Sequence, residues 1–97
     1  MRAAPSEPFG SAVARLMRER GLSYRGLARE TGLSAGYLNH LVQGTRPAPS
    51  DAVLERLATA LGVTVDRFTE HRLRRVSERL AASPELVDRL YHETVQD

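Results

Sequence analysis

The sequence predicts an all-helical protein with a single core. Leu, Ala, Arg and Glu, which favour helices, dominate its 97 residues, and runs of β-branched residues are absent. Apolar residues recur at helical spacing in several segments, and Ser and Gly stand at the ends of most of them. A chain of this length forms one domain, so we expect several short helices around one modest core.

The first predicted helix covers residues 8–20 and ends at Gly21. Its apolar residues recur at i, i+3, i+4, i+7 and i+8, which indicates one buried stripe. The stripe consists of Phe9, Ala12, Val13, Leu16 and Met17. Residues 1–7 are small, polar and Pro-containing, and we expect a flexible arm there. Arg2 lies in this arm, either as a DNA contact or as part of a disordered terminus.

Two short helices follow, at 23–31 and 34–43, and a later group extends to residue 95. Ser23 and Ser34 are the expected N-caps of the short helices, which Gly32 and Gly44 end. Three later helices are expected. They run from Ser50 to Gly62, from Thr64 to about Ala82, and from Ser83-Pro84-Glu85 to about Val95.

The two short helices and their tight turn form a helix-turn-helix pattern over residues 23–43. Ala28 is small where the helices cross, and Gly32 supplies the positive φ that the turn requires. Leu27, Leu38 and Leu41 are expected to hold both helices on one core. The opposite face of the second helix stays free, so it can enter a DNA major groove.

Residues 9–68 resemble the lambda-repressor/Cro-type (Xre) helix-turn-helix family. The resemblance rests on Leu27-Ala28, Gly32-Leu33-Ser34, Leu38, Leu41, Gly44, and Ser50 through Leu61-Gly62-Val63. It implies a lambda-repressor-like five-helix domain at 8–68, with a recognition helix at 34–43 and an additional C-terminal helical extension. It also implies a DNA-binding transcriptional regulator, usually a dimer.

Base contacts are predicted on the free face of the recognition helix. Asn bonds adenine in a bidentate manner, His donates to guanine or phosphate, and small residues let the backbone approach the bases. The candidates are Ala35, Gly36, Asn39, His40 and Gln43. The alternative is that they are ordinary polar or small surface residues.

Phosphate contacts are predicted near the ends of the motif, where helix N-termini and Arg suit an anion. The candidates are Ser23, Tyr24, Arg25, Ser34, Tyr37, Thr45 and Arg46. The resemblance places Tyr24 where family members commonly hold a phosphate with Gln. Ser23 and Ser34 also cap helices, Tyr37 can instead pack partly against the core, and Arg46 can instead bond carbonyls at the helix end.

The helices within residues 65–95 carry apolar residues beyond the five-helix domain. These are Leu73, Val76, Leu80, Leu86, Val87, Leu90 and Tyr91. They either fold back on the same chain or pair with a second copy, and we expect dimerisation because a dimer gains affinity for a two-fold site. Arg72, Arg75 and Arg79 form either a second basic patch or a solvated face with ion pairs such as Glu70–Arg74 and Arg74–Glu78.

The charge distribution and the composition limit the classes of function that the sequence allows. Residues 1–46 hold seven Arg and three acids, a net charge of +4, whereas residues 47–97 hold seven Arg and nine acids, a net charge of −2. The basic first half suits a polyanion. With no Cys, no nucleophile elbow and no phosphate-binding Gly loop, we expect no enzyme and no cofactor. No metal site is expected, because Asp88 and His92 are more simply a surface pair.

The sequence thus predicts a cytoplasmic, nucleoid-associated regulator that binds double-stranded DNA as a homodimer, with no signal peptide and no membrane partner. The alternative is a protein-interaction module, or an antitoxin, that uses its C-terminal helices and has weak or secondary DNA binding. Ala35-Gly36, the missing Gln at Tyr24 and the apolar C-terminal helices favour that alternative.

Overall fold

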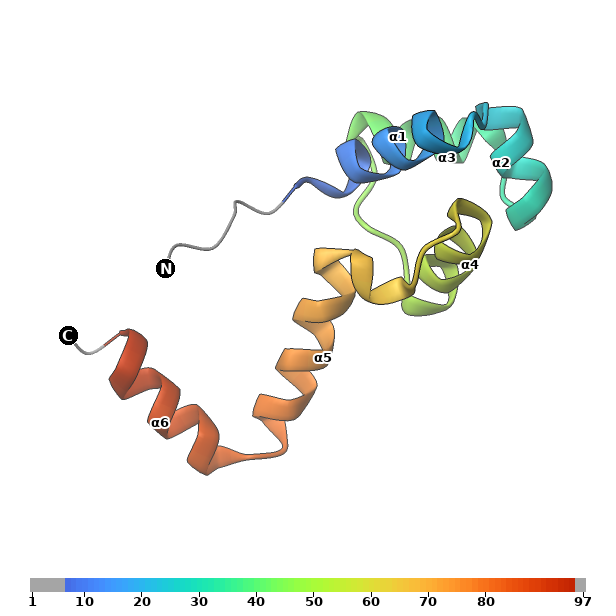
Figure 1. The fold of residues 1–97 in the computed structure, drawn as a ribbon. Helices are drawn as coiled ribbons and strands as arrows, with labels where there is room; N and C mark the ends of the chain where they lie inside the picture. Colours follow the sequence, from blue (N-terminus) through green and yellow to red (C-terminus); the bar gives the residue numbers. More distant parts are fainter. Residues whose placement is uncertain (1–6, 96–97) are drawn as a thin grey trace.

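The computed structural model describes residues 7–95, and all its regular elements in that range are helical (Figure 1). They are α1 (Phe9–Arg20), α2 (Tyr24–Thr31), α3 (Ala35–Gln43), α4 (Asp51–Leu61), the 3-10 turn η1 (Val65–Arg67), α5 (Thr69–Ala81) and α6 (Pro84–Thr94). The expectation of an all-helical fold is confirmed. The expectation for Arg2 and the rest of 1–6 lies outside the described residues. Glu7, assigned to the flexible arm, instead forms an ion pair with Arg15 at 2.9 Å.

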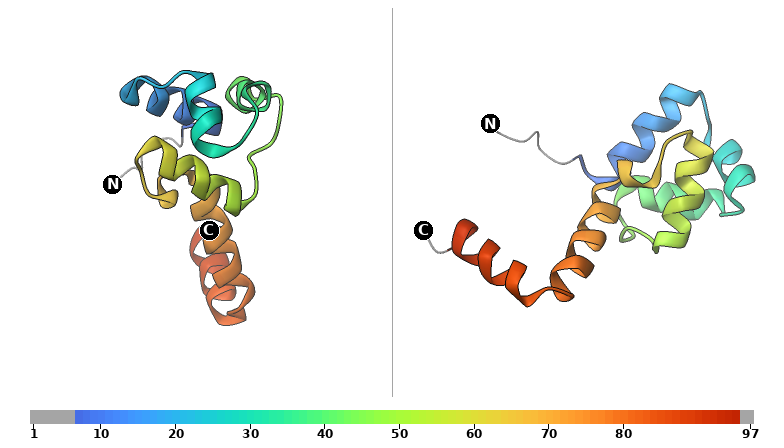
Figure 2. Two further views of the ribbon diagram at one scale, coloured as in Figure 1. Left: turned by 90° about the vertical axis from the view of Figure 1, so that its right-hand side faces the viewer. Right: turned by 60° about the horizontal axis from the view of Figure 1, so that its bottom comes forward.

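The helices form a packed cluster, α1 to α4, and a projecting C-terminal arm, α5 and α6, which is called the arm from here on. Helices α1 to α4 pack on one another, whereas α5 runs away from them and α6 turns back at an open angle from its far end (Figures 1 and 2). The molecule is therefore elongated, with extents of 48 × 27 × 24 Å. At the base of the arm, Arg74 of α5 donates to the Asp51 carboxylate at 2.8 Å and to Ala48 O at 3.5 Å.

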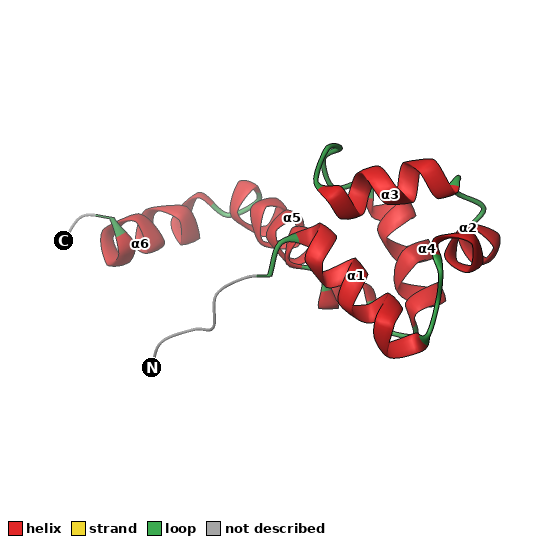
Figure 3. Ribbon diagram, turned by 90° about the horizontal axis from the view of Figure 1, so that it is seen from above, coloured by secondary structure: helices red, strands yellow, loops and turns green. Residues whose placement is uncertain are grey.

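Helix α3 lies along one edge of the cluster and packs against α1 and α2 (Figure 3). Gly10 permits the approach of α1. A Cβ at this position would lie 2.3 Å from the carbonyl oxygen of Val42 and 2.8 Å from that of Leu41. Because Gly10 has no side chain, α1 contacts the backbone of α3 directly. No pattern in the sequence predicts this role for Gly10.

The helix boundaries follow the predicted caps with two exceptions. Ser23, Ser34 and Ser83 each accept a hydrogen bond from the amide three residues later, at 3.1, 3.0 and 3.3 Å. Ser50 stands at the N-cap of α4, but its side chain makes no capping hydrogen bond. Thr64 stands at the N-cap of η1, not of a long helix, and its hydroxyl donates to the Asp66 carboxylate and makes no capping hydrogen bond.

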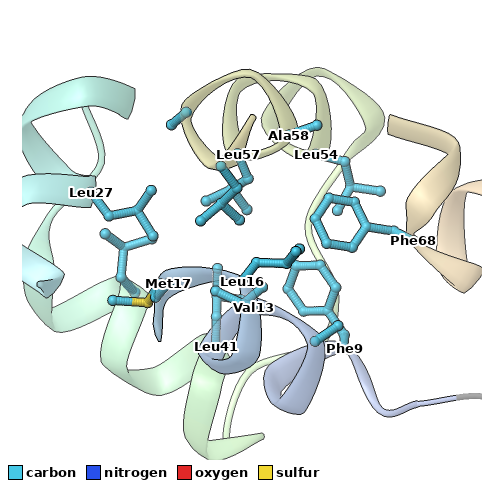
Figure 4. Packing of buried hydrophobic residues seen from close by; sticks show 14 residues of the cluster. Phe9, Val13, Leu16, Met17, Leu27, Leu41, Leu54, Leu57, Ala58 and Phe68 are labelled. Carbon is cyan, nitrogen blue, oxygen red and sulfur yellow. The ribbon is translucent and has the colours of Figure 1, made fainter. Parts of the chain in front are cut away.

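The single helix predicted from Thr64 to Ala82 is wrong at its start. The chain forms the short turn η1 and is extended at Phe68 before α5 begins. This break directs the Phe68 ring into the core, where it is 1 % exposed and lies 5.3 Å from the Phe9 ring between centroids (Figure 4). Burial of an aromatic ring outweighs the local preference for a continuous helix.

One core joins α1 to α4 and Phe68. Its buried apolar residues are Phe9, Ala12, Val13, Leu16, Met17, Leu27, Leu38, Leu41, Leu54, Leu57, Ala58, Ala60, Leu61 and Phe68. The predicted stripe of the first helix is therefore buried in full. Leu27, Leu38 and Leu41 are at most 1 % exposed, which confirms their expected role as anchors, and Ala28 packs half-buried beside them.

Two glycine substitutions are expected to change stability in opposite directions. Gly10→Ala places a methyl group against the α3 backbone and is expected to lower the free energy of unfolding by about 1–3 kcal/mol. Gly36→Ala meets nothing within 4 Å and is expected to raise it by up to roughly 0.5–1 kcal/mol, because alanine loses less backbone freedom than glycine when it enters a helix. Urea unfolding of both variants measures the difference. A Gly10→Ala variant as stable as the unmodified protein would contradict the assigned α1–α3 contact.

Candidate nucleic-acid interface

The turn between α2 and α3 is fixed by hydrogen bonds from two directions. The Thr31 hydroxyl is buried, donates to Leu27 O at 2.8 Å and accepts from the Leu33 amide at 3.2 Å. On the other side, the Arg56 guanidinium of α4 donates to the Thr31 carbonyl. Gly32 follows with φ of 76°, as the tight turn was predicted to require. These contacts set the angle at which α3 leaves the turn.

Arg56 positions the turn through this hydrogen bond, a role that no pattern in the sequence predicts. It lies 25 residues from Thr31, and its position in α4 carries no motif that points to the turn. Its role depends on the packing of α4 against α2, which exists only in the folded chain.

The predicted base-contact residues lie together on the outer side of α3. Ala35, Gly36, Asn39, His40 and Gln43 are all exposed. The anchors Leu38 and Leu41 occupy the other side of the same helix and are buried. This division follows from the helical period, which places residues three and four apart on one face. The face is formed as predicted, and its contact with bases stays a prediction.

The predicted phosphate contacts divide into two groups. The exposed members are Ser23, Arg25, Ser34, Thr45 and Arg46. Tyr24 and Tyr37 are half-buried against the core. Tyr37 therefore packs partly inward, which was the alternative interpretation for this residue. The hydroxyls of Ser23 and Ser34 accept hydrogen bonds from helix amides, so their own protons stay available to an anion.

No carboxylate lies in α3 or in the loop that follows it. Residues 35–50 contain a single formal charge, on Arg46, which is exposed. Two carboxylates with a lowered pKa lie elsewhere in the described chain. A hydrogen bond from Arg15 lowers the pKa of Glu7, and one from Arg74 lowers the pKa of Asp51. The α3 face can therefore approach a polyanion without repulsion from its own helix.

Two predicted contact residues bond each other at the end of α3. His40 Nδ1 lies 2.8 Å from Thr45 Oγ1, and that oxygen lies 3.2 Å from the His40 carbonyl oxygen. The Thr45 amide also donates to this carbonyl, at 3.0 Å. The exposed imidazole is thereby linked to the loop that follows the helix.

The predicted dimerisation residues form an incompletely covered apolar surface on α5 and α6. Leu73, Val76, Val87 and Tyr91 are 63, 52, 45 and 50 % exposed. Leu80, Leu86 and Leu90 are half-buried. Within the described chain, therefore, these helices do not fold back on the domain core, which was one of the two alternatives.

The charged side chains of the arm form a mixture of contacts. Arg72 donates to Asp66 O at 2.7 Å and to the Thr69 hydroxyl at 2.9 Å, and Arg75 pairs with Glu78 at 3.2 Å. Arg74 pairs with Asp51, so the predicted pairs of Arg74 with Glu70 and Glu78 are wrong. The reason is that α5 passes the start of α4, which brings a carboxylate from another helix within reach.

Asp88 and His92 lie 3.5 Å apart as the expected surface pair. Among residues 7–95 no group of three or more His, Cys, Asp or Glu side chains is placed to hold a metal ion. No helix in the same range is long and apolar enough to cross a membrane.

Comparison with protein families matches residues 8–70 to the helix-turn-helix domain. The chain belongs to this family. Its fold is the lambda-repressor-like all-helical fold that the sequence resemblance implied, and its family comprises DNA-binding transcription regulators rather than enzymes.

Three solved structures illustrate the relationship. The chain is similar to SinR, described as a master regulator for biofilm formation in complex with DNA, with 28 % identity, a TM-score of 0.57, and coverage of 60 % of this chain and 92 % of that one. It is also similar to ClgR, the clp gene regulator from Corynebacterium glutamicum, with 26 % identity, a TM-score of 0.59 and 94 % coverage of both chains. A SinR/SinI protein complex shares the fold at 20 % identity, a TM-score of 0.60 and 91 % coverage of both chains. Comparison with curated protein sequences found no match.

Loss of the Arg56 guanidinium is expected to loosen the turn of this helix-turn-helix. Arg56→Ala leaves the Thr31 carbonyl without its partner, which is expected to lower the free energy of unfolding by roughly 1 kcal/mol. Arg29→Ala on α2 is the matched control, because Arg29 is exposed and its guanidinium bonds no described residue. Chemical denaturation compares the two variants, and equal losses would argue against the assigned contact.

Proposed function

We propose that this helix-turn-helix protein is a sequence-specific transcriptional regulator that binds a two-fold operator as a dimer, with α3 in the major groove. The observation that carries the proposal is the exposed outer side of α3, which is uncharged and polar or small, on a helix whose inner side is buried. Such a side fits between two phosphate backbones and offers hydrogen-bonding groups to base edges.

Phosphate contacts orient α3 in this proposal. The hydroxyl protons of Ser23 and Ser34 lie at the N-terminal ends of α2 and α3, where helix dipoles favour an anion. Arg46 follows the C-terminal end of α3, and its positively charged guanidinium can bind a phosphate in a bidentate manner. The similarity to SinR, whose structure is of a complex with DNA, supports DNA binding by this domain, because that protein shares the fold over most of its length.

Dimerisation is proposed to use the apolar surface of α5 and α6. Four large apolar side chains there are about half exposed or more, which favours contact with a second surface. The surface lies on an arm that projects from the DNA-binding domain, so two copies can join without covering α3 (Figure 1). Binding to chromosomal DNA places this regulator in the cytoplasm with the nucleoid.

A second candidate function is binding of another protein on the same α5–α6 surface, as in an antitoxin with its toxin. The exposed apolar residues can bind an apolar surface of another protein as well as that of a second copy. The SinR/SinI complex is an example of a protein partner for a chain of this fold. DNA binding is then weak or secondary.

Arg46 and Asn39 are expected to affect DNA binding in different ways. Arg46→Ala removes one phosphate contact, so affinity for all duplexes falls alike and the slope of log affinity against log salt decreases by about 0.9. Asn39→Ala is expected to change the preferred base at one position per half-site, with discrimination lowered by about 1–3 kcal/mol. In vitro selection and salt titration measure both effects, with half-sites expected roughly 34 Å apart.

Arg67→Ala is the control for lost charge, because this exposed arginine lies on η1 rather than on the motif. Selection of no duplex by the unmodified protein, even at low salt, would contradict the proposed function. An unchanged base preference after both Asn39→Ala and His40→Ala would show that α3 is not the reading helix.

A charge on the arm is expected to separate the dimer. Leu73 is 63 % exposed, so Leu73→Asp leaves the fold intact and places a carboxylate in the proposed interface. The variant is expected to sediment as a monomer and to bind a two-fold site much more weakly than a dimer does. Ala52→Asp on α4 adds the same charge at an exposed position outside the arm and is the control. A monomeric unmodified protein would instead favour the second candidate.

A further inference from the structure

We infer that Thr45 determines base specificity by fixing the ring of His40 with Nε2 as a hydrogen-bond acceptor. This inference rests on the proposed function, in which the outer side of α3 meets base edges. Thr45 then acts as a positioning residue and His40 as the residue that touches the base. Sequence alone assigned Thr45 to a phosphate and made His40 a hydrogen-bond donor to guanine or phosphate.

The number of protons available to the Thr45 hydroxyl favours one arrangement of its hydrogen bonds. The Thr45 hydroxyl has one proton and two lone pairs, and it has two partners, the His40 carbonyl oxygen at 3.2 Å and His40 Nδ1 at 2.8 Å. If the hydroxyl proton goes to the carbonyl, Nδ1 carries a proton and donates to Oγ1, and both contacts are hydrogen bonds. If the proton goes to Nδ1, two oxygen atoms face each other without a proton between them. The first arrangement makes one more hydrogen bond.

The position of the ring at the end of α3 favours the same arrangement. His40 lies in the last turn, where the unpaired carbonyl groups give the helix its negative end. An N–H group at Nδ1 is stabilised in that field, whereas a lone pair at Nδ1 is not. Residues 35–50 carry no carboxylate, so no acidic side chain of this segment can accept a hydrogen bond from the His40 ring in place of Thr45.

In a neutral imidazole, a proton on Nδ1 leaves Nε2 as an acceptor. Within residues 7–95, no hydrogen bond reaches Nε2, and the His40 side chain is exposed. In the major groove only adenine N6 and cytosine N4 offer a donor to such an acceptor. His40 therefore selects adenine or cytosine and disfavours guanine and thymine at its position.

The Thr45 hydroxyl is fully used in this arrangement. Its proton goes to the His40 carbonyl and one lone pair accepts from Nδ1, so it has no proton to donate to a phosphate. Arg46, one residue later and exposed, is then the phosphate contact of this loop.

The tautomer is measured directly in the free protein. Long-range proton–nitrogen NMR correlation at pH 8.5, where imidazole is neutral, distinguishes the protonated ring nitrogen from the bare one. The expected result is a proton on Nδ1 of His40. Thr45→Val keeps the side-chain shape, removes the hydroxyl, and is expected to abolish this preference. A proton on Nε2 in the unmodified protein, or no change in Thr45→Val, would overturn the inference.

The consequence for DNA is measured by in vitro selection at the same pH. The unmodified protein is expected to enrich adenine or cytosine at one position per half-site, and Thr45→Val is expected to lose this preference by roughly 5- to 150-fold while other positions stay the same. His40→Ala identifies the position. Thr59→Val is the control, because it removes a threonine hydroxyl that bonds only within α4, to Glu55 O at 3.0 Å.

The outcomes separate the inference from the proposed function. Enrichment of guanine or thymine at the position lost in His40→Ala overturns the inference and leaves operator binding in place. An equal loss of preference in Thr59→Val and Thr45→Val also overturns it. Failure of every variant and the unmodified protein to enrich any duplex overturns the proposed function, and the base preference with it.

Discussion

The architecture depends on one constraint, which is that the short helix α3 has to bury one side and leave the other free. Leu38 and Leu41 bury the inner side in the common core, and the helical period then places Asn39, His40 and Gln43 outside. A nine-residue helix is too short to be stable alone, so its position is set by this packing rather than by its own hydrogen bonds. The exposed side of α3, which we propose faces DNA, is thus a product of the core.

Contacts from two distant parts of the chain set the position of α3. Gly10 brings α1 against the carbonyl groups near the end of α3, and Arg56 of α4 holds the carbonyl of Thr31 before α3 begins. One contact is a close approach that a methyl group would prevent, and the other is a charge-assisted hydrogen bond. Together they fix both ends of the helix, as the proposed contact of α3 with base edges would require.

The apolar residues of the arm, α5 and α6, differ from those of the core because they are not buried. Its apolar residues are spaced as in a buried helix, yet none is fully buried in a single chain. The ion pair of Arg74 with Asp51 holds the base of the arm, while Leu73 and Val76 stay exposed. Because the core of α1 to α4 and Phe68 is complete without the arm, contact of another surface with the arm would not need to alter the fold of the helix-turn-helix domain.

The sequence by itself determined the local features, because glycine and serine caps and apolar periods act over a few residues. It was sufficient for the helix-turn-helix, for Leu27 as an anchor, and for the exposed side of α3. Only the tertiary structure decided the break at Phe68, the approach at Gly10 and the contact of Arg56, because each depends on residues about 25 or more positions away. The bond between Thr45 and His40 is close in sequence, but it needed the geometry of the helix end, which no pattern of residue types specifies.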